Sequence, residues 1–405
     1  MNNKTWLVAL GLLLPPLALA APLDTAGTNA STETSSIEQQ LQQLQTQVNA
    51  LSEQQSSGSS NVPAWVNRLH IHGFGSFGLQ VTDDHSGAFY NATTNADGQT
   101  FPGANDRWDQ RGLSRAGLQV AADLDENGDT QLVTQFVARG SSNYDVRLQW
   151  AYIQHKLTPD LSVRAGRLVL PFYMHSQYYD VGYAYPWVTL PDEVYSTVPG
   201  DTADGIDLSW NVATGPVSHT FGLQWANTDI YTGSGTYHVQ NMISANMSST
   251  WRSFTVRLGY SGGKVDFMAG TPVVGIDKEY AYFANAGFKY DDGRFLLTGE
   301  WVQLDVNGYF PLYRSSYTTA GVHLGRWLPL VTYGMVDTSN RENGIAPDQQ
   351  QRRIGYGVRY DVTSQVSLKA ELNHIYGLGN SSGLFSTAPK DGSTNLLRLS
   401  VDAMF

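Results

Sequence analysis

Apolar and polar residues alternate one by one along most of the chain, most regularly at the carboxy terminus. Between 396 and 405 every odd position is apolar, whereas the even positions include Arg398, Ser400 and Asp402. Successive side chains of a strand point to opposite faces, so this segment predicts a strand with one apolar face. A final strand of this kind that ends on an aromatic residue is typical of the strand closing a transmembrane β-barrel. We therefore expect Phe405 to contribute to assembly.

The same period of two recurs from about Leu69 to Phe405 and predicts about sixteen antiparallel strands. After the first, which starts near Leu69, they span about 113–123, 130–139, 146–157, 161–169, 205–213, 218–228, 238–248, 252–260, 279–290, 294–304, 316–327, 330–337, 352–361, 365–376 and 395–405. At ~20 residues for each strand with its share of loop, 69–405 also fits about sixteen strands, a barrel wide enough for a water-filled lumen.

The expected connections alternate between short and long. Short turns are expected at 123–129, 158–160, 214–217, 248–251, 291–293, 328–329 and 361–364. Long loops are expected at 82–112, 170–204, 229–237, 261–278, 305–315, 338–351 and 377–394, with 140–145 as a short exception. Outer-membrane barrels have short periplasmic turns and longer outer loops, and an even number of strands leaves both termini in the periplasm.

The amino-terminal region follows other patterns. Lys4, the apolar run 7–14 and the Ala18-Leu19-Ala20 cleavage site predict a signal peptide over 1–21, too short for a membrane-spanning helix. Residues 22–36 are polar and predict a flexible segment. Over 37–55, apolar residues recur at spacings of four and three, which predicts a short periplasmic coiled-coil helix, followed by a linker over 56–68. Two heptads are too short to be stable alone, so they favour an oligomer, with a lone amphipathic helix on another surface as the alternative.

Composition narrows the class of exported protein. The chain has no cysteine, which excludes disulfides and thiolate metal sites, and its mean hydropathy of −0.28 excludes a helical membrane protein. Its 40 glycines and 12% aromatic residues fit a transmembrane barrel. The net charge of −11 argues against a nucleic-acid partner.

These features together resemble the trimeric porins of Gram-negative bacteria. The resemblance is carried by the Phe405 ending, the sixteen-strand layout, the strand end from Val163 to Arg167 and the long loop that follows it. The short coiled coil before the barrel is similar to that of the DcaP-like porins. The resemblance implies a homotrimer in the outer membrane, surrounded by its lipids and inserted by the barrel-assembly machinery, which conducts small hydrophilic solutes without a cofactor or catalytic residues.

The loop 170–204 is the candidate constriction because it is the longest connection and follows the fifth strand. It carries many aromatic residues and the candidate pore residues Asp180, Tyr183, Asp192 and Glu193. We expect the loop to pack on its aromatic residues and to present carboxylates and phenols to solute. The alternative is a loop that merely caps the barrel from outside.

Opposite charge is expected on the barrel wall. Taking the faces from the alternation, we expect these basic residues on the lumen side: Arg115, Arg139, Arg147, Arg164, Arg257, Arg359, Lys369 and Arg398, with Arg167 added as a further pore-lining candidate. They face fewer acids, Asp207, Glu300, Glu371 and Asp402. A basic wall opposite an acidic loop predicts a transverse field and a mild anion preference. The alternative is a general pore whose arginines only balance neighbouring carboxylates.

Other motifs are given less weight. The stretch 123–129 resembles half of an EF-hand loop but has Thr134 at position twelve, and a hairpin turn explains it better. His70 and His72 share a face without an identifiable third ligand, so no metal is expected. Two G-x-S-x-G stretches, at Ser261 and Ser381, fall at expected loop starts rather than in a nucleophile elbow. A barrel enzyme and a surface adhesin remain the alternative functions.

Overall fold

The computed structural model describes residues 66–91, 93–94, 100–101, 103–198, 200–232, 235–268, 278–306, 311–339 and 348–405. The chain divides into two units, Met1–Ala64 and Trp65–Phe405. The expected signal peptide (1–21), flexible segment (22–36), coiled coil (37–55) and most of the linker lie outside the described residues. The last residues of that linker, Val66–Arg68, form the 3-10 helix η1.

Sixteen of the described strands close into one antiparallel barrel, as the alternation predicted. They are β1 (Leu69–Thr82), β4 (Arg115–Asp123), β5 (Thr130–Arg139), β6 (Val146–Lys156), β7 (Leu161–Val169), β8 (Thr202–Thr214), β9 (Val217–Thr232), β10 (Gly235–Trp251), β11 (Phe254–Met268), β12 (Glu279–Asp291), β13 (Phe295–Val306), β14 (Leu312–Val322), β15 (Trp327–Ser339), β16 (Gln350–Asp361), β17 (Val366–Tyr376) and β18 (Thr394–Met404). Each pairs with its neighbours in the chain, and β1 closes the ring against β18.

The connections separate the two ends of the barrel. At one end, here called the turn end, the connections are 124–129, 157–160, 215–216, 252–253, 292–294, 323–326 and 362–365. At the other, the loop end, the strands are joined by 83–114, 140–145, 170–201, 233–234, 269–278, 307–311, 340–349 and 377–393. The first of these loops contains a small hairpin of β2 (Thr93–Thr94) and β3 (Thr100–Phe101). Both β1 and β18 have their chain ends at the turn end, as expected for an even number of strands.

The outer face of the barrel is apolar and the inner face is polar, as a bilayer requires. Ile71 and Trp225 on the outer face are each 54% exposed, whereas Asn373 and Asp402 on the inner face are 0% exposed. A closed sheet leaves no unpaired edge, so its backbone groups are satisfied within the barrel even in lipid. The apolar outer face and polar interior therefore suit a barrel that crosses a bilayer.

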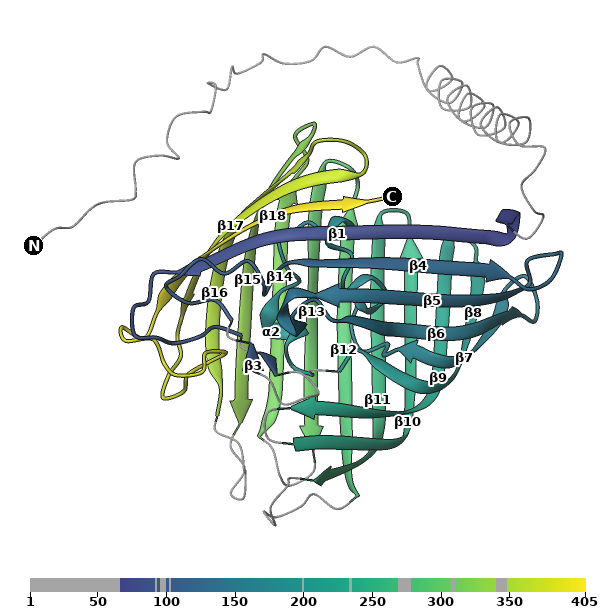
Figure 1. Ribbon diagram of the computed structural model, residues 1–405, viewed down its shortest axis with the longest axis horizontal. Coiled ribbons are helices and arrows are strands. Elements are labelled where there is room, and N and C mark those ends of the chain that lie inside the picture. The colour runs from purple at the N-terminus through teal and green to yellow at the C-terminus, as the bar shows by residue number, and fades with distance from the viewer. Residues whose placement is uncertain are drawn as a thin grey trace, which may run out of the picture. The chain divides into compact units, whose positions relative to one another are not determined.

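The described helices are short. They are η1, η2 (Gly140–Ser142), η3 (Ser176–Tyr178), η4 (Gly182–Ala184) and α2 (Asp192–Tyr195). Within the described ranges, no helix combines the length and the apolar character needed to cross a membrane. Three of the five, η3, η4 and α2, belong to the loop 170–201, and Figure 1 shows α2 within the ring of strands.

Several strands extend further toward the loop end than expected. The strands β9, β10 and β11 contain 16, 17 and 15 residues, so most of the expected loop 229–237 and the first part, 261–268, of the expected loop 261–278 are strand. Polar cross-strand pairs occupy these extensions. His238, for example, lies 2.7 Å from the carboxylate of Asp229. Because polar residues replace the apolar outer face there, the alternation that marks a half-buried strand is lost.

The turn expected at 328–329 lies at 323–326 in the structure, so this prediction was wrong. Within the turn, Gly325 has a φ of 62°, and Leu324 and Trp327 exchange backbone hydrogen bonds of 2.8 and 3.1 Å. Pro329 lies inside β15, opposite Val358. Proline is uncommon inside strands, which is why the pattern placed the turn there.

The seam between β1 and β18 is completed by the terminal residue. Figure 1 shows purple β1 beside yellow β18, which pair from Phe74 with Met404 to Thr82 with Leu396. Beyond this ladder, Gly73 and Phe405 exchange two backbone hydrogen bonds of 2.9 Å. A Cβ atom at Gly73 would lie 2.2 Å from the Phe405 ring, which therefore covers the glycine. The aromatic ring expected to aid assembly thus requires a glycine on the first strand.

We predict that Gly73→Ala impairs closure of the barrel. The added methyl group displaces the Phe405 ring and removes a cross-strand contact that contributes up to about 1 kcal/mol, so the yield of folded, heat-modifiable protein should fall. Gly75→Ala is the matched control, because a Cβ atom there meets nothing closer than 3.9 Å. Combining Gly73→Ala with Phe405→Ala should add little to either change. Wild-type folding of the Gly73→Ala protein would contradict this account.

Candidate constriction site

The loop 170–201 leaves β7 at Val169, folds into the barrel and returns to β8 at Thr202. Along the way it contacts both sides of the interior. The helix α2 packs against β13, β14 and β15, whereas η4 packs against β1 and β18. The loop therefore narrows the lumen rather than capping the barrel from outside.

Apolar and aromatic side chains give the loop its own core. Phe172 stacks on Phe283 of β12 with ring centroids 4.8 Å apart, and Tyr173 lies 4.7 Å from Tyr195. The indole of Trp187 is 1% exposed and donates hydrogen bonds of 3.0 and 3.2 Å to the hydroxyls of Thr319 and Thr332 on the wall. These contacts join the loop to the strands on one side of the barrel and fix its depth in the lumen.

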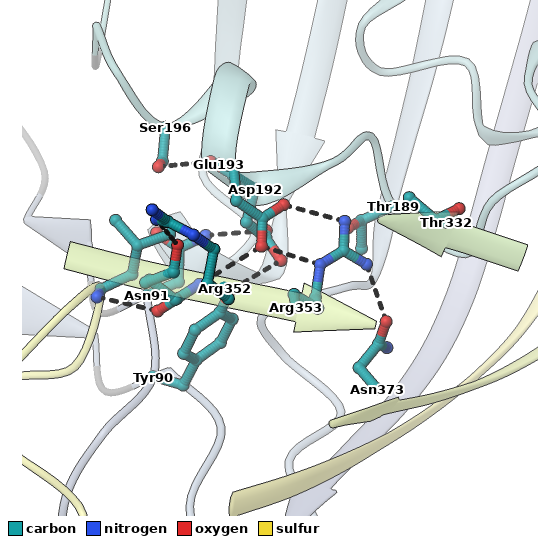
Figure 2. A network of polar contacts seen from close by, with 12 residues as sticks. Tyr90, Asn91, Thr189, Asp192, Glu193, Ser196, Thr332, Arg352, Arg353 and Asn373 are labelled. Carbon is teal, nitrogen blue, oxygen red and sulfur yellow. Dashed lines mark hydrogen bonds and ion pairs between the residues drawn. The ribbon is translucent and has the colours of Figure 1, made fainter. Parts of the chain in front are cut away.

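A fully buried ion pair joins α2 to the wall. The guanidinium of Arg353 on β16 donates two hydrogen bonds, of 2.8 and 2.9 Å, to the carboxylate of Glu193, and their side chains are 3% and 0% exposed. Arg353 also donates to Asn373 on the next strand at 2.7 Å, as Figure 2 shows. Bidentate geometry of this kind compensates best for the loss of water around both charges.

The other two candidate carboxylates of the loop are held in the same way. Asp192 accepts a hydrogen bond of 2.6 Å from Arg398 on β18. Asp180 accepts two from Arg139 on β5, of 2.8 and 2.6 Å. The loop is thus pinned by ion pairs to strands on opposite sides of the seam.

Wall cations also bind backbone carbonyls of the loop. Lys369 donates to the carbonyls of Gly182 and Trp187, Arg359 to those of Tyr183 and Tyr185, Arg115 to that of Asp180 and Arg257 to that of Pro171. Arg115 also donates to the hydroxyl of Tyr185. A buried loop has backbone groups that need partners, and these cations supply them.

Two acidic residues of the wall accept hydrogen bonds from the loop. Glu300 on β13 accepts hydrogen bonds from the backbone N–H of Met174 at 2.8 Å and from the Tyr195 hydroxyl at 2.8 Å. Glu371 on β17 accepts one from the backbone N–H of Val188 at 3.2 Å. Both acids therefore act as acceptors for the loop.

Three ionisable groups of the loop, Asp180, His175 and Tyr179, have pKa values shifted away from neutral pH. Burial alone raises the pKa of Asp180, but the charge and hydrogen bonds of Arg139, with the charge of Arg115, outweigh it and leave that pKa below its ordinary value of 3.8. Burial lowers the pKa of His175 to about 3, with Lys289 and Arg257 nearby acting in the same direction. Burial raises the pKa of Tyr179 to about 12. At pH 7 Asp180 is therefore ionised, whereas His175 and Tyr179 are neutral.

The structure places most of the candidate cations on the inner face. Arg115, Arg139, Arg257, Arg359, Lys369 and Arg398 reach the loop, as described above. Arg164 pairs with Asp207 of β8 at 2.6 Å. Arg147 lies opposite Val137, whose side chain is 2% exposed and faces inward. Tyr183 reaches the turn end, where its hydroxyl lies 3.5 Å from the carbonyl of Thr363 and the Arg359 guanidinium lies 4.6 Å from its ring centre.

Arg167 was expected to line the pore, but it lies on the outer face of the barrel. It lies opposite Ala151 and three positions beyond the inward Arg164, which puts it on the outer face. There it pairs with Asp204 at 3.0 Å, and the two side chains are 45% and 63% exposed. The period of two by itself separates Arg164 from Arg167, so the sequence held this information.

The loop carboxylates also differ from expectation. Asp180, Asp192 and Glu193 are 5%, 6% and 1% exposed, so they are not presented to solute. They touch the wall arginines directly instead of facing them across water. The expected transverse field is thereby replaced, at these positions, by ion pairs that hold the loop.

Sequence reasoning missed two important parts of the site. Arg353 has the same parity on β16 as the inward Arg359, so the alternation could have found it, but the neighbouring Arg352 made the face ambiguous. Tyr90, in the first long loop, donates a hydrogen bond of 3.3 Å to Asp192. No periodic signal marks a residue in an irregular loop.

The motifs given less weight have other roles in the structure. The carboxylate of Asp125 accepts hydrogen bonds from the backbone N–H groups of Asp129 and Thr130, as in a tight turn. Within the described residues no group of three potential metal ligands occurs. Ser261 lies inside β11 rather than at a loop start, and Ser381 donates to the carbonyl of Leu378 at 2.7 Å.

We predict that Arg353→Ala destabilises the barrel by about 3–5 kcal/mol, because it leaves the Glu193 carboxylate buried without its partner. The neighbouring Arg352 is the control: it faces outward and pairs with Asp337 while 28% exposed, so Arg352→Ala should cost no more than about 1 kcal/mol. Denaturant unfolding in detergent micelles measures both changes. The double variant Glu193→Leu with Arg353→Met should recover most of the stability. Equal losses from Arg352→Ala and Arg353→Ala would contradict the role of the buried pair.

Comparison with protein-family models and with curated protein sequences gives no match. Comparison with solved structures gives many. The barrel is similar to OmpF of Salmonella typhi (13% identity, TM-score 0.55), the anion-selective porin of Comamonas acidovorans (15%, 0.53) and the outer-membrane channel DcaP of Acinetobacter baumannii (11%, 0.53). All three matches cover 83% of this chain. They cover 97% of OmpF, 100% of the anion-selective porin and 97% of DcaP. The chain therefore has the sixteen-stranded fold of the outer-membrane porins.

Proposed function

We propose that the protein is an outer-membrane porin that lets small hydrophilic solutes diffuse through a water-filled channel. The observation that carries the proposal is the combination of a closed barrel with a polar interior and an inward-folded loop held by paired charges. Two structural neighbours, named as an anion-selective porin and as an outer-membrane channel, support it. In this proposal the loop end faces outward from the cell and the turn end faces the periplasm.

We also propose a mild anion preference, because the charges along the inner wall are unequally paired. Arg257 projects inward from β11, and its guanidinium donates to Asn246, Ser248 and the carbonyl of Pro171, all neutral acceptors. Among the described residues no carboxylate forms an ion pair with Arg257, and Glu300, whose charge acts on it, accepts its hydrogen bonds from Met174, Tyr195 and Asn285. A half-buried positive charge beside a narrowed passage attracts anions and repels cations.

We predict that Arg257→Gln lowers the anion-to-cation permeability ratio by about twofold or more, because one wall charge is lost beside the constriction. The reversal potential of the reconstituted protein in a salt gradient across a planar bilayer measures it. Arg257→Lys retains the charge and should retain the preference. Arg167→Gln removes a charge from the outer face and should leave the ratio unchanged. Cation selectivity of the wild-type protein would contradict the proposed preference, and no conductance at all would contradict the porin.

A homotrimer is the proposed assembly, supported by the heptad pattern over 37–55 and by a neighbour of Vibrio cholerae, OmpT, whose structure is named as a trimer form (TM-score 0.51, 14% identity). Two heptads contribute little alone but add to contacts between barrels when three copies associate.

We predict that the wild-type protein conducts in steps that are multiples of three and migrates as a trimer in unheated gels. Deletion of 37–55 should lower the temperature at which the trimer dissociates, because the subunits lose a second contact, without lowering the conductance of each pore. An unchanged dissociation temperature would show that the segment does not join the subunits. Monomeric wild-type protein would contradict the trimer itself.

A further inference from the structure

Two cavities, of about 550 and 290 Å³, lie beside the constriction loop and are lined by it. The larger is lined by residues of the first long loop, β4, β5 and the constriction loop, and the smaller by residues of α2, β14, β15 and the last long loop. Asn91 and Ser196 line both. The boundary between the two cavities therefore passes through these two side chains.

Asn91 closes the boundary by a direct contact with the constriction loop. Its amide nitrogen donates a hydrogen bond of 3.1 Å to one carboxylate oxygen of Asp192, and the Tyr90 hydroxyl donates one of 3.3 Å to the other. The hydroxyl of Ser196 donates at 2.5 Å to the backbone carbonyl of Asp192. Figure 2 shows Tyr90 and Asn91 meeting the Asp192 and Glu193 carboxylates.

The residues behind this contact are held on both sides by backbone hydrogen bonds. Tyr90 exchanges two with Ala104, of 2.8 and 3.1 Å, and Asn91 donates one of 2.9 Å to the carbonyl of Leu384. The Tyr90 ring is 1% exposed and lies 4.8 Å from the ring of Phe385. Gly103 permits the close approach, because a Cβ atom there would clash with the Tyr90 carbonyl at 1.7 Å. The position of Asn91 is therefore set by backbone hydrogen bonds and does not depend on the contact of its side chain with Asp192.

The contact between Asn91 and Asp192 is not needed to neutralise the carboxylate. Asp192 already accepts a charge-assisted hydrogen bond of 2.6 Å from Arg398, whose side chain is 3% exposed. Removing the Asn91 amide therefore leaves no unpaired buried charge. The expected consequence of its removal is geometric, because the side chain on the boundary between the two cavities is then shorter.

We propose that Asn91 sets the size of the largest solute that passes from the loop end to the constriction. The inference rests on the proposed porin function and adds a specificity-determining residue outside the constriction loop. Pore selectivity depends on the diameter and the polar lining of a narrow passage. Asn91 lies where the two cavities adjoin and contacts Asp192 of the constriction loop. The solutes concerned are uncharged or zwitterionic hydrophilic molecules, for which size rather than charge limits passage.

The test is the uptake of uncharged sugars of increasing size into liposomes that contain the full-length protein. Asn91 has a φ of 54°, a conformation that suits glycine, so Asn91→Gly removes the amide without backbone strain. We expect the uptake rate of a trisaccharide relative to a monosaccharide to rise at least about twofold. Asn91→Ala lacks the same amide, and although its Cβ atom strains the positive φ, the folded protein should give the same change.

A control separates this effect from general loosening. Gln110 lies in the same loop, is exposed and lines neither cavity, so Gln110→Ala removes an amide away from the boundary. It should match the wild type. An unchanged ratio in folded Asn91→Gly, or an equal rise in Gln110→Ala, would overturn the inference. Absence of sugar uptake by the wild-type protein would instead overturn the porin function on which it rests.

Discussion

The pairing of β1 with β18 is the constraint on which the rest of the molecule depends. In lipid an unpaired strand edge leaves backbone N–H and C=O groups without partners, at a cost of several kcal/mol each. A closed ladder removes that edge, and the exchange of hydrogen bonds between Gly73 and Phe405 extends it to the final residue. Closure also fixes which side of every strand is the inside, because register and parity are then set all round the ring.

The closed interior also has to accommodate the loop 170–201, with its short helices and its charged side chains. Charged groups leave water at a cost that only close partners offset. The loop meets this requirement by placing each of its candidate carboxylates on a wall arginine, as Glu193 does on Arg353. Wall cations that lack an acidic partner on the loop, such as Arg257, bind its backbone carbonyls. The constriction is therefore rigid because its polar groups are matched to the wall, strand by strand.

Most of the barrel could be predicted from the sequence, because a strand with one apolar face repeats every two residues. The same rule assigned Arg115, Arg139 and Arg398 to the inner face, where they lie. It failed where its physical basis is absent. Beyond the apolar outer face, polar pairs such as Asp229 with His238 hold the strands, and at Pro329 a residue that usually breaks strands lies within one.

The sequence by itself determined the fold class, the approximate number of strands and the face of most charged residues, since each follows from local alternation. Tertiary structure alone decided which charges meet. Asp192 and Arg398 are separated by 206 positions in the chain, and Glu193 and Arg353 by 160. No local pattern relates residues so far apart. Tertiary structure also decided that Asn91, in an irregular loop, reaches the constriction. The physical reason is that burial and pairing of charge depend on distances across the lumen, which exist only after the barrel has closed.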